Sequence, residues 1–213
     1  MVIKNQEQWD KSYDKSRSSY LLTDFLYEII FKKFKFYKRV NRYTKILDIG
    51  CGDCKVLKFL NKKGYLNLHG FDLRKYYIGN KNIELKQGNM FSMPYENNSL
   101  SVLLCFNVMH HCTTHEEYRI FLDECKRILK QDGEIFLLEP HNTIIRKINK
   151  FFCSLPILKH IGILKHKRII FQQEEKEHQM FFDLNLVDYL KKNGFKIKYT
   201  EKFIEGILIY LRR

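Results

Sequence analysis

The sequence contains few residues that interrupt regular structure. Of its 213 residues only 3 are proline and 10 are glycine, and no proline-rich or glycine/serine-rich linker divides it. Linker-dominated and collagen-like classes are therefore excluded. Hydrophobic residues make up 45% and charged residues 29%, which provides enough apolar surface to offset the entropy lost on folding. A chain of this length and composition predicts one domain with a substantial core.

Long apolar runs are also missing. The two longest candidates, Ser99–Met109 and Phe203–Leu211, are the size of strands and shorter than the roughly 18 residues of a membrane-spanning helix. Met1–Asp10 lacks the charged and then apolar layout of a secretory signal. We therefore expect a cytoplasmic protein whose 6 cysteines are free thiols.

Acidic residues are absent from two stretches, Ile29–Leu47 and Asn142–Gln173, in which lysine and arginine alternate with isoleucine, leucine and phenylalanine. The whole chain carries 38 basic and 24 acidic residues, a net charge of +14. Such a balance suits contact with nucleic acid, an anionic membrane surface or an acidic substrate. It equally suits a lysine-rich surface that only maintains solubility.

From Lys45 onward short apolar runs alternate with stretches of helical periodicity. The strands are predicted at Lys45–Gly50, Leu66–Asp72, Ile83–Gln87, Leu100–Phe106 and Glu134–Leu138. Helices are predicted at Asp53–Lys63 and at Thr114–Lys130, the second ended by Asp132-Gly133. Strands that alternate with helices indicate a parallel sheet.

The two ends of the chain follow another pattern. The last segments predict a helix over Asp183–Lys192, opened by Asp183 and closed by Asn193-Gly194, and then strands at Phe195–Thr200 and Phe203–Leu211. Two successive strands joined by a short connection predict an antiparallel hairpin on the sheet. Upstream, Gln6–Phe36 is expected to be helical.

The most informative segment is LDIGCGDC, residues 47–54, where the first strand meets the first helix. Glycines there allow positive φ and a close approach of the backbone to a ligand, so a nucleotide-like ligand is indicated. A dinucleotide fingerprint would require glycine where Lys55 stands, and no Gly-Lys-Ser/Thr follows. Asp48 can receive the ammonium of an amino acid. Asp72, twenty residues past Gly52, can hold both hydroxyls of a ribose or cap the next helix.

Five motifs occur in order: ILDIGCGDC, GFDL, QGNMFSMP, the segment FNVMHH after the fourth strand, and LDECKRILKQDGEIFLL. Together they resemble the class I S-adenosylmethionine-dependent methyltransferases, most closely the type 11 group that includes quinone-biosynthesis and other small-molecule enzymes. The resemblance implies an α/β, doubly wound, Rossmann-like fold. Its sheet would have seven mostly parallel strands, an antiparallel C-terminal hairpin and a helical cap.

The same resemblance implies an internal division of this single domain. Residues 1–44 would form N-terminal helices that act as a lid, 45–140 the cofactor-binding core, 141–182 a cap insertion, and 183–213 the last helix and hairpin. It also implies S-adenosyl-L-methionine as cofactor and S-adenosyl-L-homocysteine as product. The implied cofactor-binding residues are Asp48, Gly50, Cys51 and Gly52 at the methionine part, Asp72 at the ribose, Leu73, Asn89 and Met90 at the adenine, and Asn107 near the methionine amine.

Three positions depart from the family pattern. Cys54 stands where a third glycine is usual, Asn89 where the family usually has aspartate, and Ser101 where aspartate is common. An amide oxygen still accepts a hydrogen bond, though more weakly than a carboxylate.

Methyl transfer from a sulfonium is an in-line displacement that requires alignment and exclusion of water more than covalent help. His110 and His111, predicted at the carboxyl end of a parallel strand, are the candidate proton acceptors. Each also fits a packed or capping histidine. Cys51 and Cys54 with nearby histidines have the composition of a zinc site, but this pair lies inside the glycine turn, so no metal is expected.

The acceptor is expected to be chosen by the basic and apolar segment Asn142–Gln173 with the N-terminal helices. That composition suits a small, apolar or lipid-linked acceptor, and a peripheral contact with anionic membrane. An RNA methyltransferase is the first alternative, disfavoured because the basic excess is mostly lysine and no Asn/Asp-Pro-Pro-Tyr motif occurs. A cofactor-binding module without turnover is the second. No obligate protein partner is inferred.

Overall fold

The computed structural model describes residues 24–74, 80–141, 181, 184–203 and 206–213. In this part of the chain one seven-stranded sheet runs in the order β3-β2-β1-β4-β5-β7-β6. The strands are β1 Ile46–Ile49, β2 Leu68–Asp72, β3 Ile83–Gln87, β4 Leu100–Phe106, β5 Leu129–Glu139, β6 Lys196–Phe203 and β7 Gly206–Arg212. Strands β1 to β5 pair in parallel, and β7 pairs antiparallel with both β5 and β6. The predicted mostly parallel sheet with a C-terminal hairpin is confirmed.

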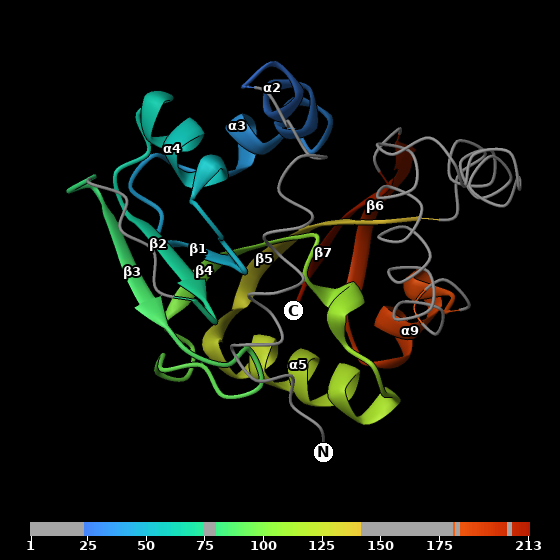
Figure 1. Ribbon diagram of the computed structural model, residues 1–213. Helices are drawn as coiled ribbons and strands as arrows, with labels where there is room; N and C mark the ends of the chain where they lie inside the picture. Colours follow the sequence, from blue (N-terminus) through green and yellow to red (C-terminus); the bar gives the residue numbers. More distant parts are fainter. Residues whose placement is uncertain (1–23, 75–79, 142–180, 182–183, 204–205) are drawn as a thin grey trace, which may run out of the picture.

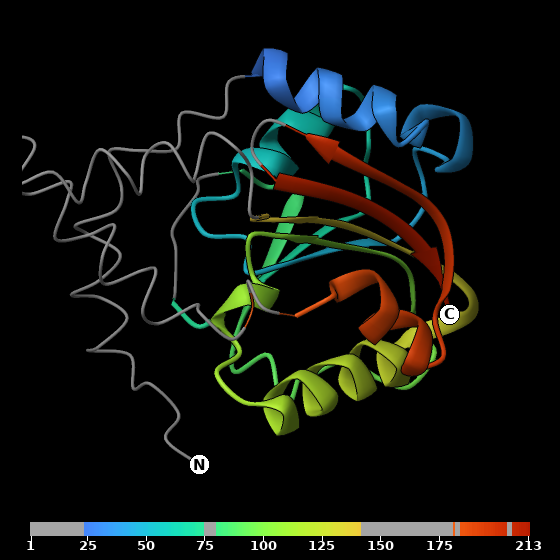
Figure 2. The same cartoon turned by 90° about the vertical axis from the view of Figure 1, so that its right-hand side faces the viewer.

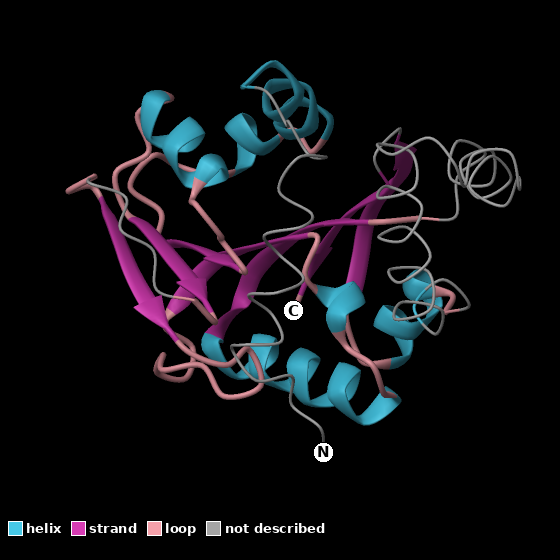
Figure 3. Cartoon of the chain, in the orientation of Figure 1, coloured by secondary structure: helices cyan, strands magenta, loops and turns pink. Residues whose placement is uncertain are grey.

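Helices cover both faces of the sheet (Figures 1 and 2). One face carries α2 (Asp24–Lys33), α3 (Phe36–Arg39) and α4 (Lys55–Lys62), and the other carries α5 (His115–Ile128) and α9 (Leu186–Lys192). Figure 3 shows the resulting three layers, with strands between two sets of helices. A doubly wound α/β architecture is therefore present, as the motifs predict.

The core divides in two because successive side chains of a strand point to opposite faces of the sheet. Leu103 and Leu137 pack with the α5 and α9 side, whereas Leu104 and Leu138 pack with the α2 and α4 side. Strand β4 is buried at six of its seven positions, since helices cover both of its faces. This explains why Leu100–Phe106 is a nearly continuous apolar run.

The boundary between α5 and β5 differs from the prediction. The helix ends at Ile128, and β5 begins at once with Leu129, so Asp132-Gly133 lies within the strand rather than stopping the helix. Leu129 is fully buried and pairs with Leu100, which draws the chain out of the helix early. A Cβ on Gly133 would lie 2.4 Å from Cγ of Leu129, so glycine lets the strand pass over this side chain.

Smaller differences occur near the two ends. The helix predicted to reach Phe36 breaks after Lys33, and Lys35 adopts a left-handed φ of 53°. This break allows both Phe34 and Phe36 to be buried, which a continuous helix would prevent because they would lie on opposite sides. Helix α9 is capped by Asn185 rather than by Asp183, and Phe203 belongs to β6.

Several expectations fall outside the described residues: the helical part of Gln6–Thr23, the cap insertion beyond His141, and Asp183. Within the described ranges, no helix has the length and apolar character needed to cross a membrane.

Candidate functional site

The candidate site lies where the carboxyl ends of β1, β2 and β4 meet, because neighbouring parallel strands end at the same edge of the sheet. The turn after β1 contains residues 50–54, and Asp72 ends β2. A loop over residues 88–99 leads from β3 to β4, and the turn after β4 begins at Asn107 and includes the short 3-10 helix η1, Met109–His111. The sheet thus brings the predicted site residues of four different segments to one edge.

The turn after β1 is built from left-handed backbone. Gly50, Gly52 and Cys54 have φ of 68°, 50° and 60°. The N–H groups of Gly50 and Cys51 donate to the carbonyl of Phe71 at 2.7 and 3.1 Å, which fastens the turn to β2. Cys54 adopts the conformation for which glycine is usual, at a cost of about 1–2 kcal/mol for a residue with a Cβ. The family departure at Cys54 therefore preserves the turn's shape.

Asp72 is tied to this turn through its carboxylate. Oδ2 accepts a hydrogen bond from the N–H of Gly52 at 2.9 Å, and Oδ1 accepts one from the N–H of Arg74 at 2.9 Å. Burial raises the pKa of Asp72, and these backbone hydrogen bonds oppose the rise. Each oxygen keeps a further lone pair, so the carboxylate can still accept from two vicinal hydroxyls.

Asp48 is a buried carboxylate in β1, with 2% of its surface exposed. Within the described residues no donor bonds to its oxygens. Burial raises its pKa well above the usual value, and the nearby Cys54 and Asp72 add to the rise. An ammonium group beside Asp48 would compensate the buried negative charge. The pair Asp48 and Asp72 therefore fits the amino-acid and ribose parts of S-adenosylmethionine.

The loop after β3 carries Asn89 and Met90. Oδ1 of Asn89 accepts from the N–H of Phe91 at 2.9 Å and so fixes a local turn, and this oxygen has a second lone pair for a ligand. Met90 is half-buried against the core below α5. On the neighbouring segment, the carbonyl of Leu73 accepts from Nε2 of Gln87 at 3.0 Å.

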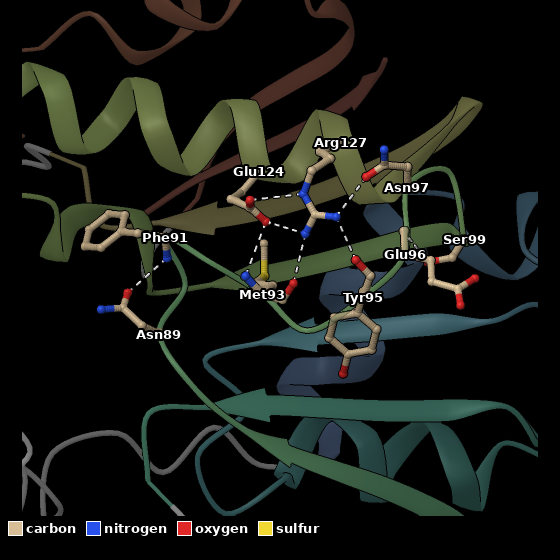
Figure 4. A network of polar contacts seen from close by, with 9 residues as sticks. All are labelled: Asn89, Phe91, Met93, Tyr95, Glu96, Asn97, Ser99, Glu124 and Arg127. Atoms are coloured by element: carbon tan, nitrogen blue, oxygen red, sulfur yellow. Dashed lines mark hydrogen bonds and ion pairs between the residues drawn. The ribbon is translucent and has the colours of Figure 1, made fainter.

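Arg127 of α5 holds the far half of this loop (Figure 4). Its guanidinium donates to the carbonyls of Met93 and Tyr95 at 2.8 and 2.7 Å and to Oδ1 of Asn97 at 2.9 Å. It also pairs with Glu124, whose Oε2 accepts from the N–H of Met93 at 3.3 Å. The loop that carries Asn89 and Met90 is thereby anchored on a helix.

The turn after β4 places the two histidines. His110 is buried, with 7% exposure, His111 is half-buried, and their ring centroids lie 4.0 Å apart. Asn107 has a left-handed φ of 58°, and its N–H donates to the carbonyl of Leu138 at 2.7 Å. The two histidines therefore lie side by side in the turn that follows the carboxyl end of β4.

Glu139, the last residue of β5, is a polar residue of this region that the sequence patterns did not reveal. It is fully buried, and Oε2 lies 2.9 Å from Nδ1 of His110. The predicted strand ended at Leu138, which left Glu139 outside any element. The available signal was a carboxylate directly after an apolar run in a parallel sheet, the same position that singles out Asp72.

Among the residues that the structure describes, no group of three or more His, Cys, Asp or Glu side chains could hold a metal ion. The sulfur atoms of Cys51 and Cys54 lie 3.5 Å apart. Five of the cysteines are free thiols, as expected, and Cys153 lies outside the described residues.

Comparison with known proteins agrees with this geometry. A family model described as a methyltransferase domain matches residues 47–137, the span from β1 into β5. An uncharacterized protein of Methanocaldococcus jannaschii is 30% identical over 198 residues, which cover 89% of this chain and 74% of that protein. The chain belongs to the class I S-adenosylmethionine-dependent methyltransferases.

Other relatives of this methyltransferase are more distant. An uncharacterized methyltransferase of Bacillus subtilis, YcgJ, is 24% identical over 130 residues, 60% of this chain and 48% of that protein. A solved structure with the same fold is the 1,6-didemethyltoxoflavin-N1-methyltransferase of Burkholderia thailandensis, bound to 1,6-didemethyltoxoflavin and S-adenosylhomocysteine. Its TM-score is 0.62 at 10% identity, over 97% of this chain and 86% of that chain. At this identity the likeness concerns the fold alone.

Proposed function

We propose that this methyltransferase binds S-adenosylmethionine along the edge formed by β1, β2 and the loop after β3, and transfers its methyl group to a small, apolar or lipid-linked acceptor. The observation that carries the binding proposal is the buried Asp48 carboxylate, which lies beside the glycine turn that Asp72 holds. Gly50, Cys51 and Gly52 would surround the methionine part. Leu73, Asn89 and Met90 would contact the adenine, and the backbone of Asn107 the amine.

Each residue of the proposed site has a separate role in the reaction. S-adenosylmethionine, when bound, supplies a methyl group on a positively charged sulfur. Asp48 balances the ammonium of the methionine part, and Asp72 accepts from the ribose hydroxyls. His110 takes the proton from the attacking atom of a hydroxyl or amine acceptor, and His111, half-buried beside it, borders the acceptor.

The acceptor class is argued from the segment Asn142–Gln173, which combines basic side chains with isoleucine, leucine and phenylalanine and lies outside the described residues. In our proposal residues 1–23 and 141–182 flank the core as lid and cap within one domain. Helices α2 and α3, which belong to the predicted lid of residues 1–44, are packed in the core on one face of the sheet instead. A segment of this composition suits an apolar molecule with an anionic group, or an anionic membrane from which such a molecule is drawn.

RNA methylation is the second candidate, because exposed cations such as Lys35, Lys38 and Arg42 gather between α2 and β1. Their place in the fold disfavours a role at the site. Arg42 precedes the amino end of β1, whereas the candidate site lies at the carboxyl ends of the strands. An RNA bound there would lie away from the methyl group.

Transfer of a labelled methyl group tests the acceptor class. The protein is incubated with methyl-labelled S-adenosylmethionine and a cell extract, which is then separated into solvent-soluble, aqueous small-molecule and acid-precipitable fractions. We expect label in the solvent-soluble or small-molecule fraction, and at least about tenfold less label with Asp72→Asn at low cofactor concentration. Label in an acid-precipitable, ribonuclease-sensitive fraction would support the RNA alternative. No label despite cofactor binding would support a binding module without turnover.

A further inference from the structure

The Glu139 carboxylate accepts several hydrogen bonds from the turn that carries the histidines. Oε1 accepts from the N–H of Val108 at 3.0 Å and from that of Met109 at 2.8 Å. Oε2 accepts from the N–H of His110 at 3.3 Å and faces Nδ1 of the same residue at 2.9 Å. These four groups belong to three consecutive residues, and the Cys105 thiol of β4 also lies 3.8 Å from Oε1, so one side chain from β5 organises the turn after β4.

The turn needs such a partner because it is the start of a 3-10 helix in a buried place. The first N–H groups of a helix have no acceptor within the helix and must find one elsewhere. Val108, Met109 and His110 are all buried, so water does not replace the missing acceptor. The Glu139 carboxylate supplies it for all three.

The contact with Nδ1 also determines which nitrogen of the His110 ring carries the proton. A carboxylate whose lone pairs are engaged by N–H groups acts only as an acceptor, so Nδ1 must carry the proton. In the neutral ring the lone pair then belongs to Nε2. This is the tautomer in which Nε2 can accept a proton, and a neighbouring carboxylate also stabilises the imidazolium that forms.

The same turn borders the proposed cofactor site. A Cβ on Gly50 would lie 2.3 Å from Cγ2 of Val108, so the Val108 side chain packs directly on the Gly50 backbone. The N–H of Val108 is bonded to Glu139. A shift of the carboxylate would therefore move both the His110 ring and the wall of the glycine turn.

We propose that Glu139 is the positioning residue of this active site, which locks His110 in the Nδ1-protonated tautomer and holds the 108–110 turn against Gly50. The inference rests on the proposed function in taking His110 as the proton acceptor. Glu139 itself is buried behind the turn and acts only through His110 and Val108.

Glu134 offers a matched control on the same strand. It is also a buried glutamate, and its Oε1 accepts from the hydroxyl of Tyr210 at 2.6 Å and from Nη2 of Arg212 at 2.8 Å. These contacts join β5 to β7 and involve no residue of the site. Glu134→Gln therefore removes a buried charge from the same strand without touching the histidines.

The test is the tautomer of His110 in protein labelled with nitrogen-15 at histidine, read from long-range proton–nitrogen spectra and assigned with His110→Gln. In the unmodified protein we expect the proton on Nδ1. In Glu139→Gln the amide oxygen still accepts from Val108 and Met109. The amide nitrogen donates to Nδ1 and no longer accepts from the N–H of His110, so the proton moves to Nε2. S-adenosylhomocysteine affinity should stay within about threefold, and labelled-methyl transfer should fall about tenfold or more. Glu134→Gln should change none of these.

A proton on Nε2 in the unmodified protein would overturn the proposal, and this measurement depends on no variant. An unchanged tautomer in folded Glu139→Gln would overturn it as well, and so would full transfer activity with the altered tautomer. Failure of the unmodified protein to bind S-adenosylhomocysteine would instead contradict the proposed function. The tautomer is measured without ligand, so the two failures are distinguishable.

Discussion

At the scale of single residues, Asp48 couples stability to binding. Its pKa is raised by burial, so the folded state holds the proton more tightly than the unfolded state does. Stability is therefore lost as the pH rises from the ordinary value of 3.8 through the raised pKa. The buried carboxyl group of Asp48 therefore lowers stability at higher pH, and a bound cation would offset this loss, which is a common compromise between stability and function.

The substitution Asp48→Asn tests whether the buried carboxyl group lowers stability. At neutral pH we expect the variant to be more stable by on the order of 1 kcal/mol, or about 2–4 °C in melting temperature at this chain length. The gain should disappear near the ordinary carboxyl pKa, where Asp48 is protonated in both states. Thermal melts over a pH series measure this, and S-adenosylhomocysteine should no longer shift the variant's melting temperature. A variant less stable at neutral pH would contradict the account.

Tyr118 illustrates a second residue whose polar group is unpaired within the described part of the chain. The residue is fully buried in α5, and its hydroxyl has no hydrogen-bond partner there. Removing a buried hydroxyl without a partner leaves nothing unpaired behind. Tyr118→Phe should therefore be neutral or more stable by up to about 1–2 kcal/mol in urea unfolding. A loss above about 1 kcal/mol would show that the hydroxyl is bonded.

At the scale of elements, α5 stabilises the loop over residues 88–99 through Arg127. Arg127→Met removes the donors to Met93, Tyr95 and Asn97 and leaves their oxygens without this partner. We expect a loss of about 2–3 kcal/mol in urea unfolding and a severalfold weaker affinity for S-adenosylhomocysteine, because Asn89 and Met90 lie on the same loop.

Arg119→Met is the matched control on α5. Its side chain is exposed and pairs with Glu116 and Asp123 on the helix surface, where ion pairs contribute little. We expect a cost below about 1 kcal/mol and unchanged affinity. Equal effects of the two substitutions would mean that the loop does not depend on Arg127.

The sequence predicted the strand and helix order well because each parallel strand is a short apolar run separated by a periodic helix. It failed where tertiary contacts decide a boundary. The burial of Leu129 ends α5 four residues before Asp132-Gly133, and no local signal marks that choice. The role of Glu139 was missed for the same reason, since its partners lie 29 to 31 residues earlier and meet it only through the sheet.

At the scale of the whole molecule, the fold explains why Asp48, Asp72 and His110 belong to segments that meet at one edge of the sheet although they are distant in sequence. The parallel order β2-β1-β4-β5 aligns the carboxyl ends of four strands, and the two apolar cores fix the sheet between its helices. Family motifs predicted this edge from residues alone. The acceptor could not be predicted equally well, because motifs describe the shared cofactor site and not the variable segments around it.

The central claim is that this edge binds S-adenosylmethionine through Asp48 and Asp72. Calorimetric titration with S-adenosylhomocysteine tests it most directly, with Asp72→Asn as the site variant and Asp123→Asn, on the exposed surface of α5, as the control. We predict a Kd on the order of micromolar for the unmodified protein and the control, and an affinity about 10–100-fold weaker for Asp72→Asn. Equal affinity of all three proteins, or no binding by any of them, would contradict the account.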